Sequence, residues 1–301
     1  MGPLATAAAH PRSAAVLGAL AIAFSGIFYV WSGVSPATGV FWRCIYGLPI
    51  LLLVARWEWR TIGPMSRRSI GLSIVAGVCF AVDLLTFHYA IDLMGAGLGT
   101  VMGNLQVVIV AIAAWLVFGE RPRPEVIVAI PVMLLGVVLM SGVVGEGAYG
   151  VDPGLGVLVG LVTAASYAGY LLVIRRASPD RRPAGPVTIA TAVTALAAGI
   201  FGWVVDDLDL VPTMPSAAYL LALGVLSQSV GYLVIQSSLP RLPAVITSVL
   251  LLVQPVATVA LGALLLGEAL SPAQLGGVAL VLAGIALATG AWRRLAGAAR
   301  G

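Results

Sequence analysis

Lysine is absent from this sequence of 301 residues, and charge of either sign is scarce. All sixteen basic residues are arginine, and together with twelve acidic residues they make up only 9% of the chain. A soluble domain has about a quarter of its residues charged. With 60% hydrophobic residues and a mean hydropathy of +1.06, the composition excludes a soluble protein and predicts an integral membrane protein. We attribute the lack of lysine to genome composition rather than to function.

The residue types that enzymes and metal sites need are also few. The two cysteines, Cys44 and Cys79, lie inside apolar runs without metal-type spacing, and the two histidines are His10 and His88. An intramembrane enzyme would need paired carboxylates, a histidine cluster or an activated nucleophile, and this chain offers none of these. No Walker-type loop is present, so ATP is not expected as the energy source. We therefore expect no cofactor, no metal and no catalytic residues.

Long apolar runs dominate what remains. They are longer than the roughly ten-residue alternating strands of a membrane barrel, and a helix needs about 20 apolar residues to cross a bilayer. The fold class predicted is an all-α integral membrane protein with ten transmembrane helices. The expected spans are 14–33, 37–55, 70–91, 95–118, 126–145, 154–175, 185–204, 216–236, 244–266 and 272–292.

The arginines alternate with these spans. Fifteen of the sixteen lie in the two tails or in the connections after the second, fourth, sixth and eighth spans. The other five connections contain no arginine, and four of them carry acidic residues instead. Because cytoplasmic segments of membrane proteins are enriched in basic residues, both termini are expected in the cytoplasm of a cell whose inner (plasma) membrane the chain spans. The same pattern explains the pI near 9.4 without nucleic acid as a partner.

Two segments match at an offset of 148 residues. LQVVIVAIAAWLVFGE (105–120) aligns with VQPVATVALGALLLGE (253–268), so Gln106 meets Gln254 and Glu120 meets Glu268. The expected organisation is a tail at 1–13, a first repeat at 14–141, an external loop at 142–153, a second repeat at 154–289 and a tail at 290–301. Five helices is an odd number, so the two copies would have opposite orientations. Inverted repeats of this kind are typical of secondary transporters.

Ten helices, two five-helix repeats, an arginine in the second span and Gly-Glu at the ends of the fourth and ninth spans resemble the drug/metabolite transporter superfamily, EamA-like branch. The resemblance covers nearly the whole chain. It implies a secondary transporter that moves amino acids, other small metabolites or drugs by alternating access, commonly outward. The alternatives are a channel or a non-transporting membrane scaffold, and, less favoured, an intramembrane enzyme. The seventh span departs from the second because it contains no arginine.

Arg43 and Asp83 are the two charged residues well inside predicted spans. At about 1.5 Å per residue, Arg43 lies roughly 9 Å and Asp83 roughly 12 Å from the same face of the membrane. Since an unpaired arginine at mid-membrane costs about 2.5–3.5 kcal/mol on insertion scales, an Arg43–Asp83 ion pair is expected. The pair could be structural or functional. His88, five residues after Asp83, is a candidate for proton coupling together with Asp83, or a histidine that serves packing.

Amides and hydroxyls at mid-membrane depth are the candidate substrate-binding residues. Amide side chains in lipid seek polar partners, so each could also join helices rather than bind a solute. The candidates are Gln106, Asn104, Gln254, Gln228, Tyr170, Tyr232 and Ser166. The expected partners are therefore a small-molecule substrate and the lipid bilayer.

Overall fold

The computed structural model describes residues 11–118, 123–178, 184–234 and 253–289. In these ranges every regular element is a helix, and seven helices are long and apolar enough to cross a membrane, with three shorter apolar ones beside them. The predicted all-α membrane class is therefore confirmed. The count of ten spans and the inverted repeat remain predictions, and most of the two predicted tails lies outside the described residues.

The helices begin and end where the sequence places proline and glycine. Proline opens α3, α7 and α8, where its missing N–H costs nothing, and Gly63 and Gly95 follow α3 and α4 with positive φ angles. The elements are α2 (Pro11–Ser32), α3 (Pro36–Ile62), α4 (Arg67–Met94), α5 (Ala96–Gly103), α6 (Gln106–Phe118), α7 (Pro124–Met140), α8 (Pro153–Ala177), α9 (Ala184–Val204), α10 (Ser216–Ala222), η1 (Leu223–Gly231), α13 (Val253–Leu261), η3 (Gly262–Leu266) and α14 (Pro272–Thr289).

Three predicted spans are not regular helices throughout. The fourth is divided into α5 and α6 at Asn104 and Leu105, where the Asn104 side-chain amide donates to the Thr100 carbonyl at 2.8 Å. The eighth changes from α10 into the π-helical η1, and the ninth from α13 into the π-helical η3. Side chains that compete for backbone groups cause such irregularities, and π-turns occur often at functional sites.

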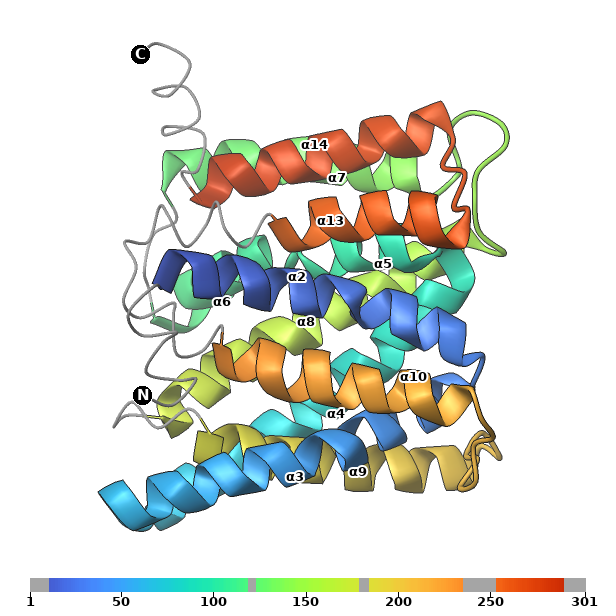
Figure 1. The fold of residues 1–301 in the computed structure, drawn as a ribbon. Helices are drawn as coiled ribbons and strands as arrows, with labels where there is room; N and C mark the ends of the chain where they lie inside the picture. Colours follow the sequence, from blue (N-terminus) through green and yellow to red (C-terminus); the bar gives the residue numbers. More distant parts are fainter. Residues whose placement is uncertain (1–10, 119–122, 179–183, 235–252, 290–301) are drawn as a thin grey trace.

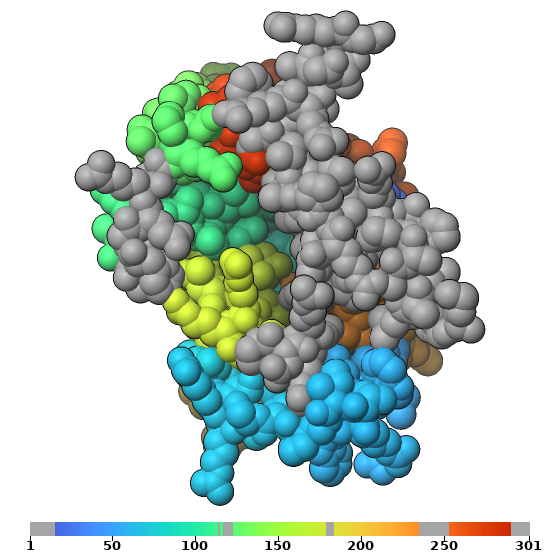
Figure 2. Space-filling view, turned by 90° about the vertical axis from the view of Figure 1, so that its left-hand side faces the viewer, coloured from blue at the N-terminus to red at the C-terminus, as the bar shows by residue number. Residues whose placement is uncertain are grey.

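Figure 1 shows the helices running roughly parallel to one another in stacked layers. α7 and α14 pack together at one edge, and α3 and α9 at the other, with α4 in contact with both α8 and α9 between them. We call the end with the α2–α3, α7–α8, α9–α10 and η3–α14 connections the arginine-free end, on the right in Figure 1. The opposite, arginine-rich end is seen in Figure 2, where α3 and α4 lie below α8 and α7 above it.

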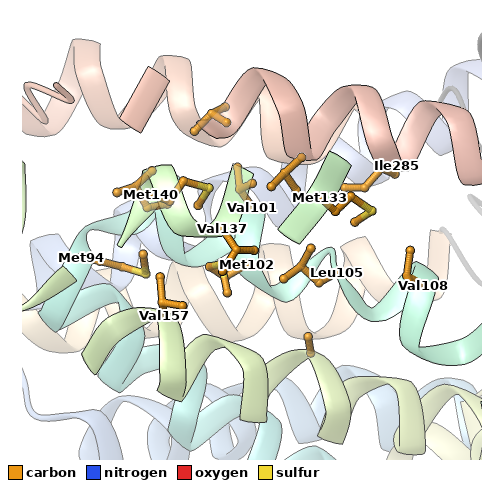
Figure 3. Close-up of a cluster of buried hydrophobic side chains, with 14 of the residues drawn as sticks. Met94, Val101, Met102, Leu105, Val108, Met133, Val137, Met140, Val157 and Ile285 are labelled. Atoms are coloured by element: carbon orange, nitrogen blue, oxygen red, sulfur yellow. The ribbon is translucent and has the colours of Figure 1, made fainter. Parts of the chain in front are cut away.

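A methionine-rich apolar cluster joins α5, α7, α8 and α14 (Figure 3). Met102 and Met140 are fully buried in it, and Met133 is 3% exposed. α7 and α14 approach closely because a Cβ at Gly136 would lie 2.7 Å from the Gly277 carbonyl oxygen. This tight contact fixes the edge of the bundle formed by α7 and α14. Most of the buried polar side chains lie instead on α2, α3, α4, α9 and η1.

Candidate functional site: a buried arginine beside an aromatic cluster

Arg43 on α3 is the largest fully buried side chain among the described residues, with 1% of its surface exposed. Its Nε donates to Oε1 of Gln228 on η1 at 2.8 Å, and its Nη1 donates to Oγ of Ser25 on α2 at 3.1 Å. Both acceptors are neutral. Hydrogen bonds from a charged donor are stronger than neutral ones, so an amide and a hydroxyl stabilise the cation at this depth.

Asp83 on α4 is also buried, with 5% of its surface exposed, and it interacts electrostatically with Arg43. Among the described residues, however, no ion pair within 4.0 Å joins the two side chains, and the hydrogen bonds that Arg43 makes there go to Gln228 and Ser25 instead. Matching depth predicted the same height in the membrane, but depth does not fix the direction in which each side chain points. Direct pairing in another state of the protein stays a prediction.

Gln228 connects Arg43 to the opposite half of the chain. Its Nε2 donates to Oγ1 of Thr191 on α9 at 3.1 Å, and the side chain is fully buried. Thr191 follows Arg43 by 148 residues, the offset found between the two halves of the sequence. Next to Gln228, the Ser229 hydroxyl donates to the Gly47 carbonyl of α3 at 2.8 Å. The π-helical segment therefore ties α3 and α9 together at the position of the buried charge.

Four aromatic side chains form a cluster beside Asp83. The rings of Phe80 and Tyr170 stack with centroids 4.5 Å apart, Tyr167 stacks on Tyr170 at 5.9 Å, and Tyr232 packs edge-on against Phe80 at 5.6 Å. The Tyr167 and Tyr232 side chains lie close enough to interact through their hydroxyl groups. The hydroxyl of Tyr170 is buried and has no hydrogen-bond partner among the described residues. A buried polar group without a partner is unusual and costs free energy.

His88 lies further along α4, fully buried, with its ring stacked on that of Tyr29 at a centroid distance of 4.0 Å. Within the described part of the chain neither ring nitrogen meets hydrogen-bond geometry with a partner, although the Pro36 backbone lies near. The Tyr29 hydroxyl contacts both carboxylate oxygens of Asp92 at 3.0 Å. His88 and Arg43 also interact electrostatically, so the histidine belongs to the surroundings of the buried cation.

The remaining predicted binding residues lie apart from this cluster. Gln106 and Gln254 are half-buried, each near the start of its helix. The Asn104 side-chain amide donates to the Thr100 carbonyl. Ser166 is half-buried on α8, one turn before Tyr170. Among the described residues no hydrogen bond joins any of the four to Arg43 or Asp83. The structure thus brings together Gln228, Tyr170 and Tyr232 with the two charges.

Four members of the candidate site were not among the predicted residues, namely Ser25, Phe80, Tyr167 and Thr191. Ser25 had a weak signal, since a loose match of the first and sixth spans, at an offset of 141 residues, places it opposite Ser166. A phenylalanine or threonine inside an apolar run carries no signal, because both residue types are common there. No group of three or more His, Cys, Asp or Glu side chains able to hold a metal occurs in the described ranges.

An open hollow of about 460 Å³ lies at the arginine-free end. It is lined by the α2–α3 connection and the 206–216 segment, including Asp206, Asp207 and Asp209. The Asp207 carboxylate accepts the Ala37 N–H at 3.2 Å, at the first turn of α3. This hollow opens to solvent and is separate from the Arg43 cluster.

Comparison with known proteins places the chain in a family. The chain is 27% identical over 244 residues to YwfM, an uncharacterized transporter of Bacillus subtilis, covering 81% of this chain and 77% of that protein. An uncharacterized protein of Pseudomonas aeruginosa is 33% identical over 205 residues, covering 65% and 68%. A crystal structure of a protein with 18% identity matches the fold with a TM-score of 0.61, covering 92% of this chain and 98% of the other. The family model of EamA-like transporters matches twice, at residues 13–142 and 154–290, and the chain is therefore a member of the EamA-like transporter family.

Proposed function

We propose that the chain is a secondary transporter that exports small organic solutes, such as amino acids, other metabolites or drugs, by alternating access. It would sit in the inner (plasma) membrane with both termini in the cytoplasm, its ten spans forming two inverted five-helix halves. Membership of a transporter family supports the general activity. The arginine-free connections at one end support the orientation.

One observation carries the choice of site. Arg43 is a permanent cation buried inside the bundle, and its two hydrogen bonds to described residues go to neutral groups. A guanidinium has five N–H donors, and it binds carboxylate and phosphate groups in a bidentate manner. We propose that Arg43 receives an anionic group of the solute, with Gln228 orienting the guanidinium.

The aromatic cluster forms the other part of the proposed solute site, beside Arg43. Phe80, Tyr167, Tyr170 and Tyr232 surround the same region as Asp83. Apolar walls with a few placed polar groups are typical of small-molecule sites. The unpartnered Tyr170 hydroxyl would gain a hydrogen bond when a solute enters. Gln106, Asn104, Gln254 and Ser166 remain candidates for lining the path to this site.

For energy coupling we propose the proton, with His88 as the group that binds it. The buried imidazole makes no hydrogen bond with the described residues, and it interacts with Arg43, so a solute anion at Arg43 would change its electrostatic surroundings. Asp83 is the second candidate. Histidine is the side chain whose unperturbed pKa, near about 6.5, lies closest to physiological pH.

A solute panel tests the proposal. Purified protein in lipid vesicles is loaded with labelled amino acids, organic acids and organic cations, with and without an inward proton gradient. The proposal expects saturable export of a solute with an anionic group, faster with the gradient. In His88→Gln the dependence on the gradient should disappear while gradient-free exchange continues.

Two results would contradict this function. Flux that rises linearly with solute concentration and never saturates would indicate a channel. No flux of any panel member, from protein that is folded and correctly inserted, would favour the scaffold alternative. Saturable transport that ignores the gradient would remove proton coupling alone.

A further inference from the structure

A buried carboxylate caps a helix from the other half of the chain. Glu268 follows η3, is only 4% exposed, and accepts the Ala96 N–H at 2.5 Å and the Gly97 N–H at 3.0 Å. These N–H groups open α5 and have no partner within their own helix. The carboxylate also lies at the positive end of the helix dipole. Both oxygens are thus used to hold α5 from the opposite half.

Three glycines make the room for this carboxylate. A Cβ at Gly95 would lie 2.9 Å from Glu268 Oε1, a Cβ at Gly97 would lie 2.9 Å from Oε2, and a Cβ at Gly262 would overlap Oε2. Gly267, with φ of 69°, turns the chain immediately before Glu268. Gly95 and Gly97 therefore shape a slot fitted to one side chain.

The connection between the two halves covers the slot. A Cβ at Gly95 would come within 2.8 Å of the Tyr149 ring, so that ring lies over the cap. Tyr149 is held by Gln274 of α14, which accepts the Tyr149 N–H at 2.8 Å and donates to the Tyr149 carbonyl at 2.9 Å. Excluding water in this way strengthens the hydrogen bonds of a carboxylate, because the local dielectric is lower.

A matching cap lies at the arginine-rich end. Glu58, near the end of α3, is 6% exposed and accepts the N–H groups of Ala184 and Gly185, at 3.0 and 2.9 Å, where α9 begins. Each cap therefore joins one family-matched stretch to the other, at opposite ends of the bundle. Alternating access requires contacts between the halves to close one end while the other opens.

We propose that the Glu268 cap is the gate contact that keeps the arginine-free end closed, and that its release lets α5 separate from α13 and η3 there. The inference rests on the proposed function, because a gate presupposes alternating access. Asp207 also caps a helix at this end, but it lines the open hollow, where water competes for its hydrogen bonds. Glu268 is buried, so its contact differs most between a closed and an open state.

Thiol labelling of Ile27→Cys tests the gate. Ile27 of α2 is fully buried in the same apolar cluster as Ala96, and its neighbour Gly26 packs on the Ala96 Cβ. The rate of reaction with a membrane-impermeant maleimide is measured on purified protein, with no solute present. The parent chain, which has Cys44 and Cys79, gives the background.

Glu268→Ala in the Ile27→Cys background should raise the labelling rate about tenfold or more, because it removes two hydrogen bonds to a charged acceptor. Glu268→Gln keeps one acceptor oxygen and should give an intermediate rate. The matched control is Glu58→Ala, which removes the same chemistry from the opposite end. It should leave the labelling rate of Ile27→Cys unchanged or lower.

An unchanged labelling rate in Glu268→Ala would overturn the gate assignment. Equal increases in Glu268→Ala and Glu58→Ala would overturn it too, because they would indicate that losing either cap loosens the whole bundle. If the alanine variant does not fold, an unchanged rate in Glu268→Gln overturns it equally. Solute flux in vesicles is measured separately. Altered labelling without any flux would remove the transport function and leave Glu268 only as a contact that closes the arginine-free end. Flux with unaltered labelling would remove the gate assignment and leave the transport function.

Discussion

α3 and α9 occupy matching places in the two halves of the chain, yet one carries a buried cation and the other does not. Arg43 of α3 and Thr191 of α9 are 148 residues apart and bind the same Gln228 side chain from two sides. The first turns of both helices are capped by a carboxylate from the other half of the chain. Glu58 of α3 caps α9, and Asp207, just after α9, caps α3. The two helices thus share the same kind of cap, but only α3 carries a buried charge at the matching position.

Under the proposed function, this difference leaves two family-matched stretches with one buried cation between them, and so with one place for an anionic group of the solute. A second arginine at position 191 would place two cations around one amide, which repel each other strongly in a low dielectric. Thr191 instead fixes Gln228 through a hydroxyl, so that the amide oxygen faces Arg43. The second half thus orients the cation of the first.

Exchanging the two buried charges tests whether Arg43 and Asp83 depend on each other. Arg43→Asp places two acids together and Asp83→Arg two cations, and each should lose about 3–5 kcal/mol of stability because a buried charge is left uncompensated. The double variant keeps the total charge and should recover more folded protein than either single variant. The measurement is the yield of monodisperse protein after purification. A double variant no better than the worse single one removes the pairing hypothesis.

Gln228→Ala should reduce transport more than Thr191→Val does. The first removes a hydrogen bond from a charged donor, equivalent to about 1.5–3 kcal/mol, and the second removes a neutral one, about 0.5–1.5 kcal/mol. Initial rates of flux in vesicles measure both effects. If Thr191→Val were the more damaging change, Gln228 would not be oriented for Arg43, and α9 would contact the solute itself.

Gln106→Ala and Gln254→Ala should change the kinetics of transport by less than Gln228→Ala. Both side chains are half-buried and share no hydrogen bond with Arg43 among the described residues, so they would line the path rather than hold the solute. The concentration dependence of flux reveals the change. Two folded variants with unaltered kinetics would show that these amides only join helices.

The smallest effect concerns pH and Glu268. Burial raises the pKa of Glu268 above its usual 4.5, and the N–H groups of Gly97 and Ala96 oppose this only in part. A raised pKa in the folded protein means that the free energy of unfolding is highest in acid and falls as the pH rises from 4.5 to the raised pKa, because deprotonation is harder in the folded state. The melting temperature of the wild type should fall relative to Glu268→Gln over that interval. Parallel melting curves for both proteins would show that Glu268 does not titrate there.

The sequence predicted the helical membrane class and most of the polar residues of the site, because a charge or amide is conspicuous inside an apolar run. It placed Arg43, Asp83, Gln228, Tyr170 and Tyr232 at mid-membrane depth, and the structure brings these five together. It could not predict that Gln228, rather than Asp83, accepts from Arg43. Depth along a helix follows from residue number, whereas the direction of a side chain depends on how neighbouring helices are rotated.

The two glutamate caps could not be predicted for a different reason. Glu58 lies among the residues flanking a span, where a charged residue is expected to face water, and Glu268 was recognised only as part of a repeat. Their partners are backbone N–H groups, which every residue except proline has and which therefore leave no mark in a sequence. Glu120, the counterpart of Glu268 in the first half, lies outside the described residues.

The most direct test of the account is the equilibrium affinity of a transported solute for Arg43 variants, measured by calorimetry on purified protein. We expect Arg43→Gln to abolish binding, Arg43→Lys to weaken it at least about tenfold because lysine lacks the bidentate fork, and Thr191→Val to weaken it only slightly. All three proteins should elute as the wild type does in size-exclusion chromatography. Wild-type affinity in folded Arg43→Gln would contradict the assignment of the solute site to the buried arginine.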